Sequence, residues 1–170
     1  LGKLEEAEAS CRRAIEINPT HVNSHFNLGN ILKERKATAE ALAAFRQALV
    51  LQPSHSESAL ALGLILRNQA QFEEAEAVYR QAVQFNPDHA GVHLELGNTQ
   101  RSQDRPEEAE VWYRRAIALS PAEVAPHLNL GNALTDLDRL EEAEAAYRHA
   151  TTLQSDPDFV TARFNLSMLL

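Results

Sequence analysis

The chain has 170 residues, of which 44% are hydrophobic, and its formal net charge is −8. The hydrophobic content suffices for a buried core, while the acidic balance disfavours partners such as nucleic acid or an anionic membrane, which require a concentrated basic face. The single cysteine, Cys11, excludes an internal disulfide and a cysteine-based zinc site, and it fits a reducing, cytoplasmic location.

The composition also predicts the fold class. Alanine, glutamate, leucine, arginine and glutamine favour helix, whereas aromatic residues make up only 6% of the chain, too few to build a large sheet. The longest wholly apolar run, residues 59–66, is far shorter than the roughly 20 residues of a membrane-spanning helix. We therefore expect an all-α protein with no membrane-spanning segment. Because the chain lacks an initiator methionine, we also expect a fragment of a longer protein.

A short string recurs along the chain at a fixed interval. NLGN stands at 27–30 and 129–132, ELGN at 95–98 and ALGL at 61–64, so that neighbouring copies are 34 residues apart. Within each interval the apolar residues recur three and four positions apart, as on one face of an α-helix, and two helices fit. The period therefore predicts a stack of helix pairs in which each pair buries its face on its neighbours.

In chain order, the predicted elements are a half unit, four helix pairs and a last single helix. Their ranges are 1–21, 22–55, 56–89, 90–123, 124–159 and 160–170, which gives about ten helices in a single array. Acidic pairs such as Glu73-Glu74 stand in the first turn of the second helix of a unit and complement its dipole. A proline such as Pro87 ends each unit, and Pro157 arrives two residues late in the longer one.

Numbering each unit so that the recurring glycine is position 8 reveals further columns. Position 7 is leucine, positions 20 and 27 are alanine, position 24 is aromatic in four units, and position 32 is proline. These columns resemble the tetratricopeptide repeat over essentially the whole chain. Glycine inside a helix costs about 1 kcal/mol relative to alanine. We therefore expect a contact at position 8 that is too close for a Cβ, with the alanines at positions 20 and 27 facing it.

The resemblance implies an α-solenoid whose first helices line a concave groove for a protein or peptide ligand. The family's groove positions correspond here to Phe26, Asn27, Asn30, Lys33, Leu60, Leu64, Arg67, Leu94, Glu95, Asn98, Arg101, Leu128, Asn129, Asn132, Phe164 and Asn165. Asparagine amides can both donate to and accept from a peptide backbone. The basic residues at position 12 can attract an acidic segment. The first functional prediction is thus a protein–protein interaction scaffold.

Two alternatives stay open. Asn27, Asn129 and Asn165 match the asparagine ladder in the tetratricopeptide arm of O-linked N-acetylglucosamine transferases, which implies a substrate-recruiting arm of a larger enzyme, although Ala61 and Glu95 depart from the ladder. The other is end-to-end self-association, because the first and last predicted helices each lack a pairing helix. The carboxylate clamp of chaperone-binding members is disfavoured, because its lysine position, 5, is apolar in every unit.

No motif indicates catalysis, a cofactor or a metal. The chain has no GK[ST], GxGxxG, HExxH, GxSxG or CxxC string. His21 and His25, like His89 and His93, stand four residues apart, a spacing that would suit a shared metal ion on a helix. All four belong to repeat columns, so we interpret them as packing or helix-start residues. We expect no enzymatic activity, no cofactor and no metal site.

Overall fold

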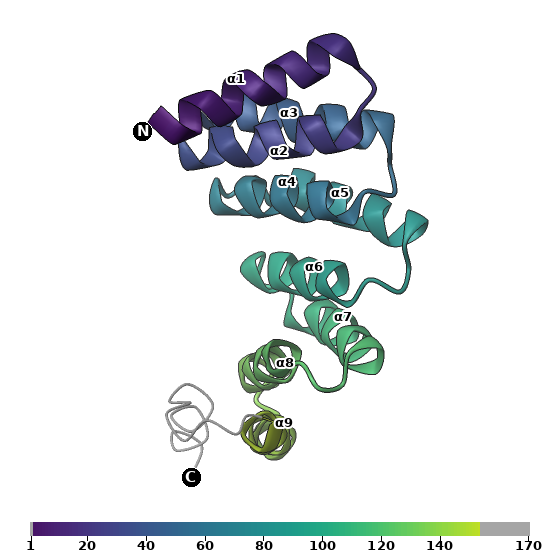
Figure 1. Ribbon diagram of the computed structural model, residues 1–170. Helices are drawn as coiled ribbons and strands as arrows, with labels where there is room; N and C mark the ends of the chain where they lie inside the picture. Colours follow the sequence, from purple (N-terminus) through teal and green to yellow (C-terminus); the bar gives the residue numbers. More distant parts are fainter. Residues whose placement is uncertain (1, 154–170) are drawn as a thin grey trace. The chain divides into compact units, whose positions relative to one another are not determined.

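The computed structural model describes residues 2–153 and leaves residues 1 and 154–170 undescribed. Residues 2–153 form nine α-helices and no strand (Figure 1). The helices are α1 (Gly2–Ile17), α2 (Val22–Glu34), α3 (Thr38–Leu51), α4 (Ser56–Asn68), α5 (Phe72–Phe85), α6 (Ala90–Ser102), α7 (Pro106–Leu119), α8 (Val124–Asp136) and α9 (Leu140–Leu153). The all-α prediction is confirmed. The predicted last helix, with Phe164 and Asn165, lies outside the described residues.

The helices belong to two compact units, unit 1 (Leu1–Pro87), which contains α1 to α5, and unit 2 (Asp88–Leu170), which contains α6 to α9. In unit 1, α2 packs on α3 and α4 packs on α5, while α1 covers α2. In unit 2, α6 packs on α7, α8 packs on α9, and α7 also contacts α8. The first helices of successive pairs touch as well, α2 with α4 and α6 with α8. Within each unit, the first helices therefore share a surface.

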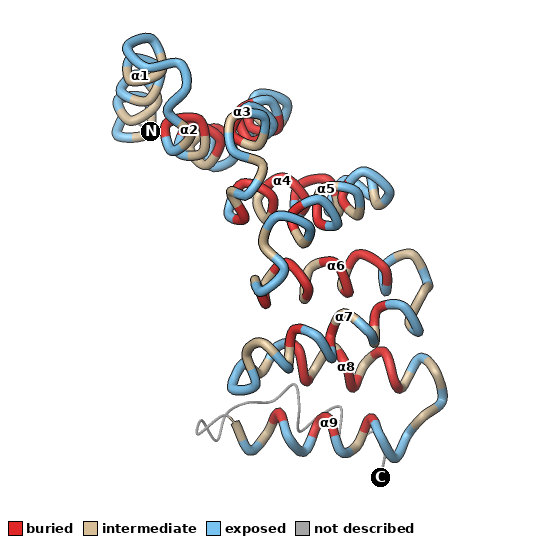
Figure 2. Tube along the Cα trace, turned by 90° about the vertical axis from the view of Figure 1, so that its right-hand side faces the viewer, coloured by how far each residue is buried: buried red, intermediate tan, exposed pale blue. Residues whose placement is uncertain are grey.

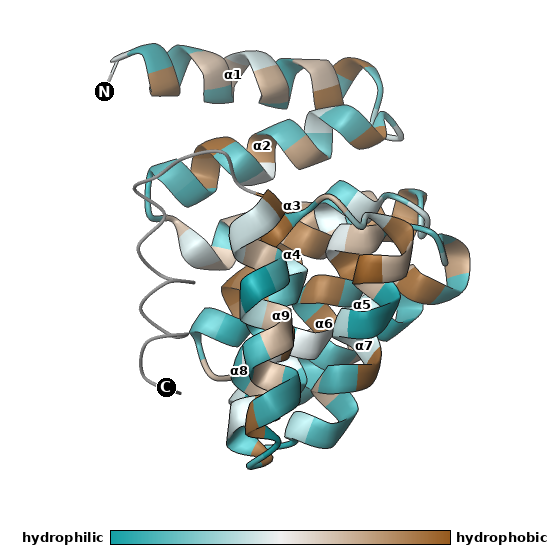
Figure 3. Cartoon of the chain, turned by 90° about the horizontal axis from the view of Figure 1, so that it is seen from below, coloured by the Kyte–Doolittle hydropathy of each residue, from teal (hydrophilic) through white to brown (hydrophobic). Residues whose placement is uncertain are grey.

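Burial follows the expected helical stripe. From α2 to α9 the buried residues line the side of each helix that meets its neighbours (Figure 2). Helix α1 differs, because none of its residues is buried. Hydrophobic and hydrophilic residues alternate along α1 (Figure 3), and one side of it packs on α2. Within residues 2–153, no helix is both long enough and apolar enough to cross a membrane.

Each recurring glycine lies against the aromatic residue of the second helix in its own pair. A Cβ built on Gly29 or Gly97 would lie 2.6 Å from the ring of Phe45 or Tyr113. The rings of Tyr79 and Tyr147 occupy the same place at Gly63 and Gly131. The expected close contact is therefore present, but the expected partner was wrong: the facing group is the ring at position 24, not the alanines at positions 20 and 27.

A left-handed residue ends each first helix and turns the chain into the second. Lys36, Ala70, Asp104 and Asp138 all have φ between 58° and 62°, although none is glycine. The residue that follows donates its N–H to the carbonyl five residues earlier, as in a Schellman motif: Gln71 donates to Leu66 at 2.9 Å and Arg105 to Gln100 at 3.0 Å. The sequence columns gave no sign of this turn, because glycine is absent from position 15.

Ion pairs join successive second helices at a separation of 28 residues. Arg12 pairs with Glu40, Arg46 with Glu74, and Arg114 with Glu142. The acidic residues at the starts of the second helices thus have a cationic partner in addition to the helix dipole. Because these side chains are exposed, each pair contributes only about 0 to 1 kcal/mol.

We expect Gly97→Ala to destabilise the protein by about 1 to 2 kcal/mol. A Cβ 2.6 Å from the buried Tyr113 ring places the overpacking in the upper part of the usual range, at about 2 to 3 kcal/mol, and the better helix propensity of alanine offsets about 1 kcal/mol of that. Gly2→Ala is the matched control, since a Cβ there meets nothing within 4 Å. Urea unfolding measures both. Equal or greater stability of Gly97→Ala would contradict the ring contact.

Ala70→Gly should stabilise the protein by about 0.5 to 1 kcal/mol, because a left-handed alanine costs about 1 to 2 kcal/mol, and the added freedom of glycine in the unfolded chain removes part of that gain. Asp104→Gly is the comparison variant, and its gain should be smaller because aspartate tolerates this conformation. Thermal and chemical unfolding measure the difference. A loss of stability in Ala70→Gly would show that the turn is not strained.

Candidate functional site

The predicted groove residues of unit 2 lie on α6 and α8, the two first helices, which contact each other. They are Leu94, Glu95, Asn98 and Arg101 on α6 and Leu128, Asn129 and Asn132 on α8. All are half-buried except Arg101, which is exposed. We call this surface of unit 2 the amide face, because its asparagines form the hydrogen bonds described next.

Asn98 stands at the centre of the amide face. Its Oδ1 accepts two hydrogen bonds, one from the Tyr113 hydroxyl at 3.0 Å and one from Asn129 Nδ2 at 2.8 Å. Tyr113 is fully buried, so Asn98 provides a hydrogen-bond acceptor for a hydroxyl of the core. The bond from Asn129 joins α8 to α6. The two bonds leave the Nδ2 group of Asn98 and the Oδ1 atom of Asn129 as a neighbouring donor and acceptor.

The hydroxyl of Tyr147, the second tyrosine in the described part of unit 2, also donates a hydrogen bond to an asparagine. The Tyr147 hydroxyl donates to Asn132 Oδ1 at 2.8 Å and lies 3.3 Å from Thr135 Oγ1. In both pairs of unit 2, position 9 therefore supplies a hydrogen-bond acceptor for the tyrosine at position 24. In unit 1 the position-24 residue of the α2/α3 pair is Phe45, which has no hydroxyl to donate to Asn30.

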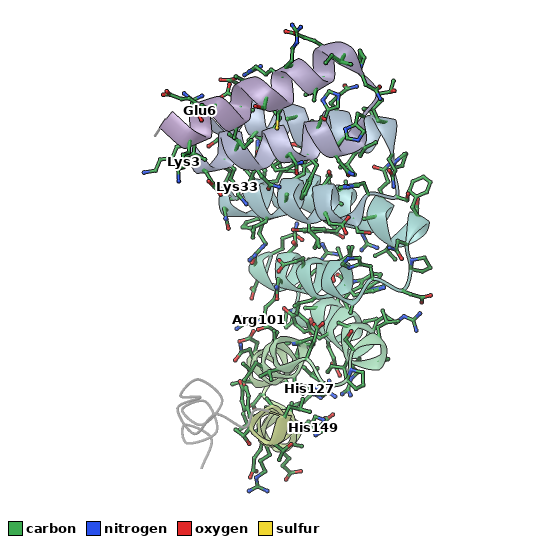
Figure 4. All side chains as sticks on the ribbon, in the orientation of Figure 1. Lys3, Glu6, Lys33, Arg101, His127 and His149 are labelled. Carbon is green, nitrogen blue, oxygen red and sulfur yellow. The ribbon has the colours of Figure 1, made fainter. Side chains whose placement is uncertain are left out.

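Arg101 is already neutralised within unit 2. Its Nε lies 2.7 Å from Oδ2 of Asp136, and its Nη2 lies 3.4 Å from Oδ1 of the same carboxylate. Partial burial opposes the charged form, but the Asp136 carboxylate outweighs it and raises the pKa of Arg101. Figure 4 shows Arg101 at one edge of unit 2. The predicted attraction of an acidic segment by the position-12 cations is correspondingly weak at Arg101.

The predicted residues of unit 1 lie on α2 and α4. They are Phe26, Asn27, Asn30 and Lys33 on α2 and Leu60, Leu64 and Arg67 on α4. The Phe26 ring centroid is 5.9 Å from that of Phe45 and 5.2 Å from that of His55, so Phe26 helps to pack the unit.

Unit 1 presents a more apolar and more cationic surface than the amide face does. Leu64 occupies the column in which unit 2 has asparagines, and its side chain is 37% exposed. Lys33 is exposed, and Figure 4 shows it on the same side of unit 1 as Lys3 of α1, with Glu6 nearby. The two units therefore offer different chemistry at equivalent positions.

Models of the tetratricopeptide repeat match residues 10–43, 60–124 and 125–157, which together cover well over half of the chain. The chain belongs to the tetratricopeptide repeat family. A comparison with curated proteins found no match. The fold is that of helical repeat proteins, a class that typically serves as protein-interaction scaffolds.

Solved tetratricopeptide structures resemble the chain closely in fold and weakly in sequence. MamA from Desulfovibrio magneticus is 22% identical, with a TM-score of 0.79 over 92% of this chain and 89% of that one. YrrB, described as a TPR protein with an unusual peptide-binding site, is 22% identical, with a TM-score of 0.78 over 96% and 83%. A thermophilic TPR protein in Thermus thermophilus is 21% identical, with a TM-score of 0.73 over 99% and 91%.

The histidines of this tetratricopeptide chain have structural contacts. At position 4, Nε2 of His25 lies 2.8 Å from the carbonyl of Pro19, and Nε2 of His127 lies 3.1 Å from that of Pro121. At position 34, Nδ1 of His55 lies 3.2 Å from the backbone N–H of Ser58 and caps α4. These contacts agree with a packing or helix-start role. Across residues 2–153, no three histidine, cysteine, aspartate or glutamate residues are grouped in a way that could hold a metal ion.

Two side chains that bond to residues of the amide face were not predicted from the sequence as part of this site. Asp136 is the ion-pair partner of Arg101. The pattern that could have predicted this pair is an arginine at position 12 of one unit and an aspartate at position 13 of the next unit. Tyr113 was interpreted only as a core residue, although a tyrosine follows both Asn98 and Asn132 by 15 residues. That recurrent spacing is the pattern that would have revealed the hydroxyl–amide bond.

Removing the Tyr113 hydroxyl should destabilise the protein by about 0.5 to 1.5 kcal/mol, the net contribution of one buried hydrogen bond. The replacement Tyr113→Phe keeps the ring that packs on Gly97, and Phe45 shows that the position accepts phenylalanine. A double-mutant cycle with Asn98→Ala, followed by urea unfolding, isolates the pair. We expect a coupling of about 0.5 kcal/mol or more, and purely additive effects would contradict the bond.

Proposed function

We propose that the chain is a protein-interaction module that binds an extended peptide segment of a partner across the amide face of unit 2. The observation that carries the proposal is the pairing of Asn98 with Asn129. Because Asn98 Oδ1 accepts from Tyr113 and from Asn129, both amides are held in one orientation. The free Nδ2 group and the free Oδ1 atom can then bond the carbonyl and the N–H of a peptide backbone, whatever its side chains.

The surroundings of the amide pair suit an extended ligand. Leu94 and Leu128 are half-buried beside the two asparagines and offer apolar contacts to ligand side chains. Arg101 and Asp136 neutralise each other at one edge, so a strongly charged segment gains little there. Fixed amides lose little conformational freedom on binding, which favours affinity. The likeness to YrrB, a TPR protein with a peptide-binding site, supports the proposal at the level of the fold.

The recruiting-arm alternative also uses asparagines of the first helices, since Asn129 on the amide face and Asn27 on α2 of unit 1 match the ladder positions of such an arm. A recruiting arm would be joined to an enzyme domain in the same gene product and a free-standing scaffold would not, so the sequence of the full-length gene product distinguishes the two.

End-to-end stacking is favoured by a different observation. Helix α1 has no buried residue, so it has a side on which a further helix can pack. Sedimentation that stays monomeric at high concentration would contradict this candidate.

A peptide selected from a displayed random library against the wild-type protein is the probe for the main proposal. We expect Asn129→Ala to weaken its binding about 3- to 10-fold in fluorescence anisotropy, the effect of losing one or two hydrogen bonds. The melting temperature should fall by only about 1 to 6 °C, because Asn129→Ala removes one part-buried hydrogen bond, the bond to Asn98.

Gln84→Ala is the control, because it removes an exposed carboxamide from a second helix. It should leave the affinity for the same peptide unchanged. If Asn129→Ala binds the selected peptide as tightly as wild type does, the amide face is not the site.

A further inference from the structure

A pocket lies among α7, α8 and α9 of unit 2, on the side of the second helices and away from the amide pair. Its volume is about 520 Å³, within the usual range for small-ligand sites. The apolar lining comes from Ile117 of α7, Leu130 and Leu134 of α8, and Ala146 of α9, and two imidazoles, His127 and His149, complete it. We call it the imidazole pocket. Figure 4 shows His127 and His149 beside each other, and their ring centroids are 4.4 Å apart.

The same repeat columns form a second pocket in unit 1. It lies among α1, α2 and α3, has a volume of about 460 Å³, and is lined by Ile15, His25, Leu28, Leu32, Ala44 and Gln47 among others. Both pockets have a histidine at position 4 and an alanine at position 23. Equivalent columns thus line a cavity in the two pairs whose position 23 is alanine, while the second imidazole, His149, belongs to the pocket of unit 2 and Gln47 stands in its place in unit 1.

Trp112 shows what happens when position 23 is large. In the α6/α7 pair, the indole of Trp112 stacks on the ring of His93, with centroids 5.6 Å apart and planes 23° apart. His93, at position 4, is only 2% exposed. The chain thus covers one position-4 imidazole with an aromatic side chain of its own, whereas Ala146 stands at position 23 in the α8/α9 pair and His127, which is 6% exposed, lines the imidazole pocket.

The charged groups around the imidazole pocket are paired with one another, which favours a neutral ligand group inside it. At the rim, Arg114 pairs with Glu110 and Glu142, and Glu142 also pairs with Arg139. Burial lowers the pKa of His127, the carbonyl of Pro121 acts in the opposite sense, and the nearby His149 lowers it further. The lowered pKa favours the neutral form of His127, on which a neutral ring can stack without burying an unpaired charge.

We propose that the imidazole pocket binds an aromatic side chain of a partner protein, which stacks on His127 as Trp112 stacks on His93. The site is separate from the amide face and does not depend on it. A tetratricopeptide chain of this kind then holds its partner on two surfaces, a backbone-binding one on the first helices and a side-chain pocket on the second helices. Two such contacts on one partner would reinforce each other.

The test titrates the whole chain with N-acetyl-tryptophanamide as the probe. Binding is monitored through the ring signals of His127 and His149 in ¹H–¹⁵N NMR at pH 7.5. We expect saturable shifts with a dissociation constant on the order of 1 to 10 mM, as befits one small aromatic group. N-acetyl-glutamate amide, which carries a charge, should give at least about tenfold smaller shifts. Absence of a saturable response to the tryptophan probe would overturn the proposal.

Ala146→Trp fills the pocket in the way that Trp112 fills its own position, and it should reduce the response at His127 and His149 at least about tenfold. Ala44→Trp is the matched control, because it fills the pocket of unit 1 and should leave the unit 2 response intact. The amide spectrum and the melting curve establish that each variant is folded. Should Ala146→Trp not fold, Ala146→Leu narrows the same space with a smaller side chain and must also weaken the response.

Two further results separate this proposal from others. Asn129→Ala should leave the histidine shifts unchanged, so a failure of the amide face and a failure of the pocket are distinguishable. A folded Ala146→Trp variant that still responds fully would place the probe elsewhere and overturn the proposal. So would a wild-type dimer that Ala146→Trp dissociates, because the occupant would then belong to a second copy of the chain.

Discussion

The contact between a helical glycine and an aromatic ring determines the geometry of every helix pair. Gly29, Gly63, Gly97 and Gly131 each lie against the ring at position 24 of the same pair. The ring is fully buried at Phe45, Tyr79 and Tyr113, and nearly so at Tyr147. Since neither a ring in a filled core nor the helix backbone can yield, the first and second helices are held at one separation and angle. The remaining features of each unit are built on this fixed pair.

In unit 2 the same aromatic column reaches the functional surface. The hydroxyls of Tyr113 and Tyr147 extend past the glycines to Asn98 and Asn132, so the core dictates how the asparagine amides are oriented. Asn129 then bonds to Asn98 and links the two first helices. A surface whose polar groups are held from beneath is preorganised, and preorganised groups bind a ligand at a smaller loss of entropy.

The features that recur in every unit could be predicted from the sequence, whereas the contacts between residues of different repeat columns could not. The 34-residue spacing, the helix pairs and the close contact at position 8 all followed from residue identity alone. The identity of the facing ring did not, because glycine, alanine and aromatic columns are each compatible with several packings. Lys36 and Ala70 in left-handed turns were unforeseen, since tertiary packing overrides the preference for glycine there. The pairing of Arg101 with Asp136 depends on which columns of adjacent units meet, and this is known only once the helices are packed.

The central claim is that Asn98 and Asn129 bond a peptide backbone while Tyr113 holds Asn98 in place. Side-chain amide NMR tests this claim most directly, with a selected peptide bound to the wild-type protein. The account predicts that the Asn98 Nδ2 protons shift downfield to the position of a hydrogen-bonded amide and become protected from exchange with water. Unchanged Asn98 and Asn129 signals, at peptide concentrations that saturate the protein, would contradict it.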